Sequence, residues 1–288
     1  MLHASVCNPV HTALPTSLCE YLETRIASSA LELPLLPHVA SQVLAMSTSD
    51  DTNARSLAEL LHHDQAIAAH VLRVANAPLY RPRVPLVSLQ QAISRLGLAT
   101  LREIVITVTM QSRIFNIPSY ATEARALWQH AVYTAAYAGK IARRCRRNVE
   151  GAFLGGLLHD ISKPVLLLAL ADLQAQLQEP IPPPVVIMAM DVYHTQVGAV
   201  LASTWTLPPE VGASMVYHHD HSAAPAYPEA AMVTCLADRV AYALVQPDIA
   251  LEHLRHDPLW TQLNLYPDDV EALLNEHQAI VQFAEAIG

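Results

Sequence analysis

Apolar side chains recur every three to four residues along most of this chain, which is the period of an amphipathic α-helix. Ile67, Val71 and Val74 show this spacing directly after Asp64, a residue type that favours the N-cap position. The β-branched run 104–109 resembles a strand on its own, but the sequence offers no partner strand. We therefore predict an all-α protein.

The second half of the chain carries the longest helical patterns. They predict helices over 121–146, 150–159, 163–178, 184–203, 208–218 and 227–245, and a last pair over about 248–256 and 267–286. Twenty prolines separate many of the apolar stretches, as expected of residues that interrupt helices. No internal repeat is apparent.

Polar breaks suggest how the chain is divided. We predict a tail over 1–22, an N-terminal helical lobe over 23–118, a histidine-bearing helical bundle over 119–245 and a C-terminal helical extension over 246–288. Three tetrapeptides have the form of a capping box, in which a Ser or Thr and a Glu or Gln satisfy the first backbone N–H groups of a helix. They start at Ser56, Ser88 and Thr100.

Composition narrows the function classes. Of the 288 residues, 52% are hydrophobic and 15% are charged, enough apolar surface for a sizeable core. The formal net charge is -9. We therefore do not expect binding to DNA, because proteins that bind the phosphate backbone carry an excess of Lys and Arg. The four cysteines show no CxxC spacing, and no aliphatic run approaches the ~20 residues that span a bilayer. We expect a cytoplasmic protein with reduced thiols and no membrane partner.

Basic residues concentrate in one place. Five of the 17 Lys and Arg residues lie within 140–147. Cations at the C-terminus of a helix oppose its macrodipole, which is the simpler explanation. A docking face for an acidic protein partner or a nucleotide is the alternative.

Residues that hold divalent metals recur through the second half of the chain. They are His130, His159, Asp160, His194, His218, His219 and Asp238, with Lys163 three positions after the first His-Asp pair. A single histidine on an apolar helix is usually a hydrogen-bonded core residue, and His194 alone would be assigned that role. Chance explains the whole ordered set with Lys163 poorly. Trp128, Tyr193 and Tyr217 lie beside these residues and either line a base-binding pocket or pack in the core.

The His159-Asp160 pair resembles the hallmark of the HD superfamily of metal-dependent phosphohydrolases, and further segments are similar to HDOD domains, which are bacterial signal-transduction output domains of that fold. The similar segments are 33–37, 63–65, 72–77, 92–97, 153–161, 194–198 and 205–208. The resemblance covers roughly residues 25–225. It implies an HD-like helical bundle and a regulatory role, because HDOD domains are not generally regarded as hydrolases.

The seven candidate ligands also resemble the set of the HD-GYP class, the metal-dependent cyclic-dinucleotide phosphodiesterases. Two departures matter. Ser162 replaces the glycine of the His-Asp-x-Gly-Lys motif, and no Gly-Tyr-Pro follows His219. The second departure removes the segment associated with phosphodiesterase activity in that class.

Metal chemistry would need these residues to converge. Two metals about 3.5–4 Å apart require roughly six protein ligands and a bridging group, a role for which the resemblance suggests Asp160. One or two divalent metals are expected, and imidazole with carboxylate suits Fe, Mn, Zn or Ni. Lys163 would be the catalytic residue, neutralising charge on a phosphate oxygen.

We therefore expect a bacterial regulatory protein that acts as a binding output module, with a degenerate or metal-occupied HD site. Protein partners in a signalling pathway are expected, and a nucleotide is a second candidate ligand. The alternative is a metal-dependent phosphodiesterase acting on a cyclic dinucleotide or another nucleotide. Enzyme activity is therefore the less favoured reading, and the oligomeric state is left open.

Overall fold

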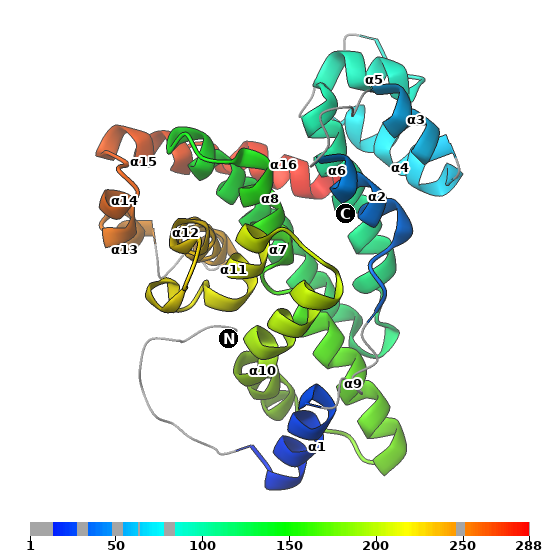
Figure 1. Cartoon of the computed structure of the whole chain (residues 1–288), viewed down its shortest axis with the longest axis vertical. Helices are drawn as coiled ribbons and strands as arrows, with labels where there is room; N and C mark the ends of the chain where they lie inside the picture. Colours follow the sequence, from blue (N-terminus) through cyan, green and yellow to red (C-terminus); the bar gives the residue numbers. More distant parts are fainter. Residues whose placement is uncertain are drawn as a thin grey trace.

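Every regular element in the described part of the chain is a helix, as predicted (Figure 1). The computed structural model describes residues 14–27, 34–47, 54–62, 64–77, 84–245 and 251–287. In the first half, the helices are α1 (Thr16–Ala27), α2 (His38–Ser47), α3 (Ala54–His62), α4 (Gln65–Ala75), α5 (Leu89–Leu96), α6 (Leu98–Ile114) and the 3-10 turn η1 (Pro118–Tyr120).

The second half follows the predicted helix boundaries to within one or two residues as far as α12. Its helices are α7 (Ala121–Arg144), α8 (Val149–Leu158), α9 (Ser162–Leu177), α10 (Pro183–Thr204), α11 (Pro209–Tyr217), η2 (His221–Ala223), α12 (Pro228–Val245), α13 (Leu251–Arg255), α14 (Pro258–Gln262), α15 (Pro267–Leu274) and α16 (His277–Ile287).

Helix α7 is the centre of the bundle. It packs most extensively against α8 and α12, and it also contacts α15 and α16. Its buried side chains occupy more than one face, from Leu127 and Trp128 to Ile141 and Ala142. A helix buried on several sides must be apolar around most of its circumference, which accounts for its many alanines.

The N-terminal helices follow some of the predicted caps and not others. Asp64 caps α4, with its Oδ1 accepting from the Ile67 N–H at 3.1 Å, and Ser88 caps α5 by accepting from the Gln91 N–H at 3.2 Å. The boxes at Ser56 and Thr100 were wrong, because α3 begins at Ala54 and α6 at Leu98. Helix formation simply starts one turn earlier than these polar residues suggest.

The expected tail of residues 1–22 needs a correction. Residues 1–13 lie outside the described part, but Thr16–Ala27 form α1, which contacts α10 and is separated from α2–α5 in space (Figure 1). Leu18 and Leu22, four positions apart, are buried. The Tyr193 hydroxyl on α10 donates to the Glu23 carboxylate at 3.1 Å. The apolar pair is too short a pattern to identify a helix from sequence alone.

The C-terminal prediction also needs a correction. The expected helix over 267–286 is two helices, because the Asn275 and Glu276 N–H groups turn back to Glu271 and Leu273 and end α15. Helix α14 was not predicted. Helix α16 packs against α7 of the bundle and against α4 and α6 of the N-terminal helices, with His70 Nε2 donating to Ile287 O at 2.9 Å. The C-terminal extension thus joins the two halves, and the predicted boundary at 118 stays a prediction.

The basic cluster at 140–147 pairs with acidic residues of the same chain. Lys140 pairs with Glu276, Arg144 with Asp269 at 2.9 Å, and Arg147 with Glu229 at 2.6 Å. Arg143 and Arg144 lie in the last turn of α7, so the macrodipole explanation applies to them. Three of the five cations therefore serve contacts within the fold, which weakens the alternative of a docking face.

Two helical stretches have the length and composition of membrane spans. They are 149–177 and 183–204, and the apolar windows within them are 94% and 44% buried inside the fold. The first is a core segment of the bundle, since almost all of its window is covered by protein.

Candidate metal centre

The His159-Asp160 pair lies at the junction of α8 and α9. His159 is the C-cap of α8, and Asp160 immediately precedes the turn from which α9 begins at Ser162. The Lys163 N–H donates to the Asp160 carbonyl at 2.9 Å, which closes this turn. Pro164 falls in the first turn of α9, where the missing N–H of proline is tolerated.

All seven predicted ligand residues converge on this junction. They come from α7 (His130), the α8–α9 junction (His159, Asp160), α10 (His194), the end of α11 (His218, His219) and α12 (Asp238). Their ligand atoms include two groups in which every atom lies within 4.8 Å of the others, namely His194 with His218 and His219, and His130 with His159 and Asp160.

The carboxylate of Asp160 lies between the two groups. Its Oδ1 is 3.7 Å from Nε2 of both His194 and His218. Its Oδ2 is 3.4 Å from Nε2 of His159. With metal–ligand bonds of about 2.1 Å, atoms bound to one ion lie about 3–4 Å apart, so these separations suit shared coordination.

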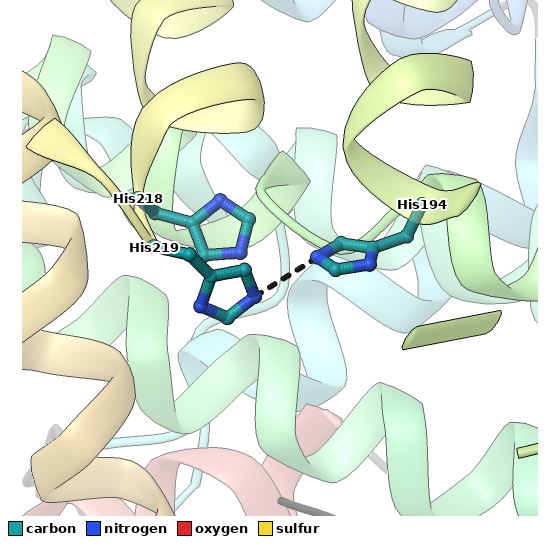
Figure 2. A group of neighbouring side chains, drawn as sticks. All are labelled: His194, His218 and His219. Atoms are coloured by element: carbon teal, nitrogen blue, oxygen red, sulfur yellow. Dashed lines mark hydrogen bonds between the residues drawn. The ribbon is translucent and has the colours of Figure 1, made fainter. Parts of the chain in front are cut away.

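The remaining ligands close the two sides of the centre. His194 Nε2 and His219 Nε2 are 3.0 Å apart, and Figure 2 shows the His194 ring directed at the two histidines that follow α11. On the opposite side, His130 Nε2 is 2.8 Å from Asp238 Oδ1, which in turn is 3.8 Å from His159 Nε2.

Three of the histidines are held in the same way. Nδ1 of His159 donates to Gly156 O at 2.8 Å, Nδ1 of His194 to Met190 O at 3.0 Å, and Nδ1 of His218 to Ser214 O at 3.0 Å. A proton held on Nδ1 leaves the lone pair of neutral imidazole on Nε2. This second contact is the one that ordinarily orients a metal-bound histidine.

Several polar atoms of the centre are buried without a hydrogen-bond partner. They include Nε2 of His159, Oδ1 of Asp160 and Nε2 of His218, all within the described residues. His159 and His218 are fully buried, and Asp160 is 4% exposed, whereas His219 is exposed at the rim. An orphaned buried acceptor destabilises a fold unless something binds it. The residues present therefore fit a divalent cation.

Electrostatics favour metal-binding protonation states at Asp160, His194 and His218, whereas the charges of Asp160 and Asp238 outweigh burial at His159 and raise its pKa. Burial lowers the pKa of His194 to about 4 and that of His218 well below its ordinary value. Burial opposes ionisation of Asp160, but the Lys163 ammonium and the neighbouring His159 hold the pKa of that carboxyl well below its usual range. At neutral pH the centre therefore presents a carboxylate and two neutral imidazoles.

Lys163 is turned inward. Its Nζ donates to Asp160 Oδ2 at 2.6 Å, and the residue is 3% exposed. Although burial lowers the pKa of Lys163, the charge of Asp160 outweighs it and the pKa is raised. Asp191 Oδ1 is 4.0 Å from the same nitrogen. Sequence reasoning missed Asp191, although its position three residues before His194 on one helix face was a usable signal.

Two glycines allow the helices of the centre to approach. A Cβ on Gly155 would lie 2.6 Å from Ser214 Oγ, and one on Gly156 would lie 2.8 Å from Cα of Ala135. Two of the neighbouring aromatic residues have roles within the fold, since Trp128 packs edge-on against Phe115 at 5.1 Å and the Tyr193 hydroxyl donates to Glu23 of α1, whereas Tyr217 is partly exposed.

Known structures share this fold. An HDOD domain protein of unknown function from Geobacter sulfurreducens superimposes with a TM-score of 0.70 at 23% identity, over 92% of this chain and 98% of the other. A Shewanella amazonensis protein, whose name proposes a metal-dependent phosphohydrolase, gives 0.71 at 21% identity over 95% and 99%. A Marinobacter aquaeolei protein, whose name proposes signal transduction, gives 0.69 at 19% identity over 97% and 67%. These likenesses establish the fold.

Sequence comparison identifies the family. An uncharacterized Treponema pallidum protein is 26% identical over 214 residues, and the match covers 71% of this chain but only 41% of that relative. The chain thus spans about two-fifths of the length of the curated relative it matches. The HDOD domain model matches residues 33–221. Because this match covers well over half of the 288 residues, the protein belongs to the HDOD domain family.

Proposed function

We propose that this protein is a regulatory binding module whose HD-type centre binds a divalent metal, and that the metal-bound form passes a signal to partner proteins. The family and the fold support a regulatory HDOD protein. The metal and the output by binding are the parts that need an experiment.

One observation carries the proposal. Nε2 of His159, Oδ1 of Asp160 and Nε2 of His218 are buried ligand atoms without a hydrogen-bond partner, and they face one another across the α8–α9 junction. A core of this size would tolerate apolar side chains at these positions. A set of convergent, orphaned ligand atoms is more simply explained by a cation that satisfies them.

The chain would hold the metal with Asp160 and the surrounding histidines, and the exposed His219 would place it at the edge of solvent. A bound divalent ion would supply a large local positive charge that links α8, α10 and α11. A metal bound by residues of three helices stabilises the arrangement of these helices to which it binds most tightly. The surface that a partner protein contacts would then differ between the metal-bound and the metal-free protein.

Elemental analysis of the protein purified without added metal tests this function. We expect near-stoichiometric Fe, Mn, Zn or Ni in the parent protein and none in the double variant His159→Ala/Asp160→Ala. Circular dichroism should show the same helical content in both. Equal metal in parent and variant would assign the ion to another place. A parent protein that binds none of these ions from a mixture would refute the proposal.

A metal-dependent phosphodiesterase is the second candidate. The two oxygens of Asp160 face separate groups of ligands, an arrangement suited to a pair of ions that polarise water and phosphate. Against it, Lys163 is bonded to Asp160 instead of facing an open pocket. We expect little or no hydrolysis of cyclic dinucleotides with added Mn²⁺. Turnover that is lost in Lys163→Ala would favour the enzyme.

A further inference from the structure

The two oxygens of Asp160 have different neighbours. Oδ1 is without a hydrogen-bond partner and lies 3.7 Å from Nε2 of His194 and of His218. Oδ2 accepts from the Lys163 ammonium at 2.6 Å. We propose that Lys163 is a built-in cation that occupies one half of the centre, so that each chain binds a single metal ion, on the Oδ1 side. This inference rests on the proposed metal binding.

The Oδ1 side is prepared for a metal. Nδ1 of His194 and Nδ1 of His218 each donate to a backbone carbonyl, so the Nε2 lone pairs of both rings are directed into the centre. His219 Nε2 lies 3.0 Å from His194 Nε2 (Figure 2). Oδ1 of Asp160 with Nε2 of His194 and of His218 offers three ligands, the number that a metal site open to solvent retains, and His219 beside His194 is a further candidate.

On the other side, the carboxylate oxygen Oδ2 itself already has a cationic partner. Besides the Lys163 bond, His130 Nε2 is 2.8 Å from Asp238 Oδ1. Two of the residues that would hold a second metal thus face each other, and the carboxylate that would bridge to it faces an ammonium.

The ammonium and a second metal would compete for the same oxygen. A divalent ion about 2.1 Å from Oδ2 would come close to a fixed positive charge in a buried place, where water screens repulsion weakly. Lys163 is 3% exposed, and its Nζ also lies 4.0 Å from Asp191 Oδ1, so two carboxylates hold the ammonium at this position.

The test uses Mn²⁺ as the probe. The full chain is stripped with a chelator, incubated with excess Mn²⁺ and desalted, and metal per chain is then counted. We expect one Mn²⁺ in the parent protein, with the electron paramagnetic resonance signal of an isolated ion. In Lys163→Met, which keeps the length of the side chain and removes its charge, we expect two ions and a spin-coupled signal. Lys140→Met makes the same change in the Glu276 ion pair and should retain one ion.

Two results would overturn the inference. Two tightly bound, spin-coupled ions in the parent would show that Lys163 does not exclude a second metal, while leaving the proposed function intact. A single ion in a folded Lys163→Met variant would show that another feature sets the number. If that variant does not fold, the number of Mn²⁺ ions bound per parent chain and their electron paramagnetic resonance signal decide whether the inference holds. Absence of Mn²⁺ from both proteins would also overturn this inference, while the proposed metal binding would still be decided by the mixture of Fe, Mn, Zn and Ni.

Discussion

Gly156 on α8 lies directly against the backbone of Ala135 on α7, where a Cβ would come within 2.8 Å of the Ala135 Cα and the Thr134 carbonyl oxygen. This close approach has a consequence for the metal centre. His159 follows Gly156 by three residues and bonds to its carbonyl at 2.8 Å, while His130 lies on the facing helix. The glycine thereby brings two predicted ligands from separate helices to one place.

Substituting Gly156 by alanine should destabilise the fold. The added methyl meets backbone, which cannot turn aside, and such overpacking costs about 1–3 kcal/mol beyond the small gain in helix propensity. Urea unfolding would measure the loss. Gly198→Ala is the matched control, because its nearest contact is an ordinary 3.5 Å, and it should be neutral or mildly stabilising. Equal effects of the two substitutions would contradict the close packing.

Adding metal should stabilise the protein against heat. A ligand that binds only the folded state at about 100 times its Kd stabilises it by about 2.7 kcal/mol, which corresponds to several degrees in Tm for a chain of this size. The shift with Mn²⁺ should vanish in His218→Asn, which removes a buried ligand. The exposed His253→Asn is the control and should keep the full shift. Persistence of the shift in His218→Asn would place the ion elsewhere.

Glu103 should make stability depend on pH. Burial, with a smaller effect of Glu150, raises the pKa of Glu103 from 4.5 to about 7. The folded state then holds its proton where the unfolded state has lost it, so stability declines as pH rises from about 4.5 to about 7 and stays lower above that. Glu103→Gln should flatten this decline and gain about 2 kcal/mol at pH 8, after a discount for partial exposure. The control Glu179→Gln, at an exposed position, should leave the dependence of stability on pH unchanged. The same lack of effect in Glu103→Gln would contradict the raised pKa of Glu103.

The C-terminal helix should contribute to the stability of the whole fold, although it lies beyond residues 33–221 that match the family. Phe283 on α16 packs edge-on against Phe153 on α8, with ring centroids 6.5 Å apart. Phe283→Ala should cost about 3–4 kcal/mol. A double-mutant cycle with Phe153→Ala should give a coupling of about 1 kcal/mol. Additive effects, or a minor loss from Phe283→Ala alone, would indicate that α16 is only loosely attached.

The helices of the second half could be predicted because their evidence is local. Apolar period, prolines and caps act within a few residues of one another, so the boundaries of α7 through α12 follow from the sequence. Helix α1 and the division between α15 and α16 could not be predicted in this way. Only two leucines of α1 are deeply buried, by packing on α10, and the end of α15 depends on a backbone turn instead of a glycine or proline.

The candidate ligands are a second case of what sequence alone determined. Their residue types, their order and their resemblance to HD proteins were enough to select seven residues that the fold brings together, because adjacent His-Asp and His-His pairs with Lys163 are rarely produced together by chance. The role expected for Lys163 depended on the tertiary structure. Whether its ammonium faces a substrate or Asp160 depends on how α9 leaves the α8–α9 turn.

Distances between separate helices are what the sequence could not supply. Contacts between residues far apart in the chain decide how the candidate ligands divide around Oδ1 and Oδ2 of Asp160 and how Asp191 approaches Lys163. They also pair the basic cluster with α12, α15 and the turn between α15 and α16. Helix periodicity specifies which face of a helix is apolar, but the packing of glycines and large side chains decides how closely two faces meet. At this centre, differences of about 1 Å determine which atoms can share a metal.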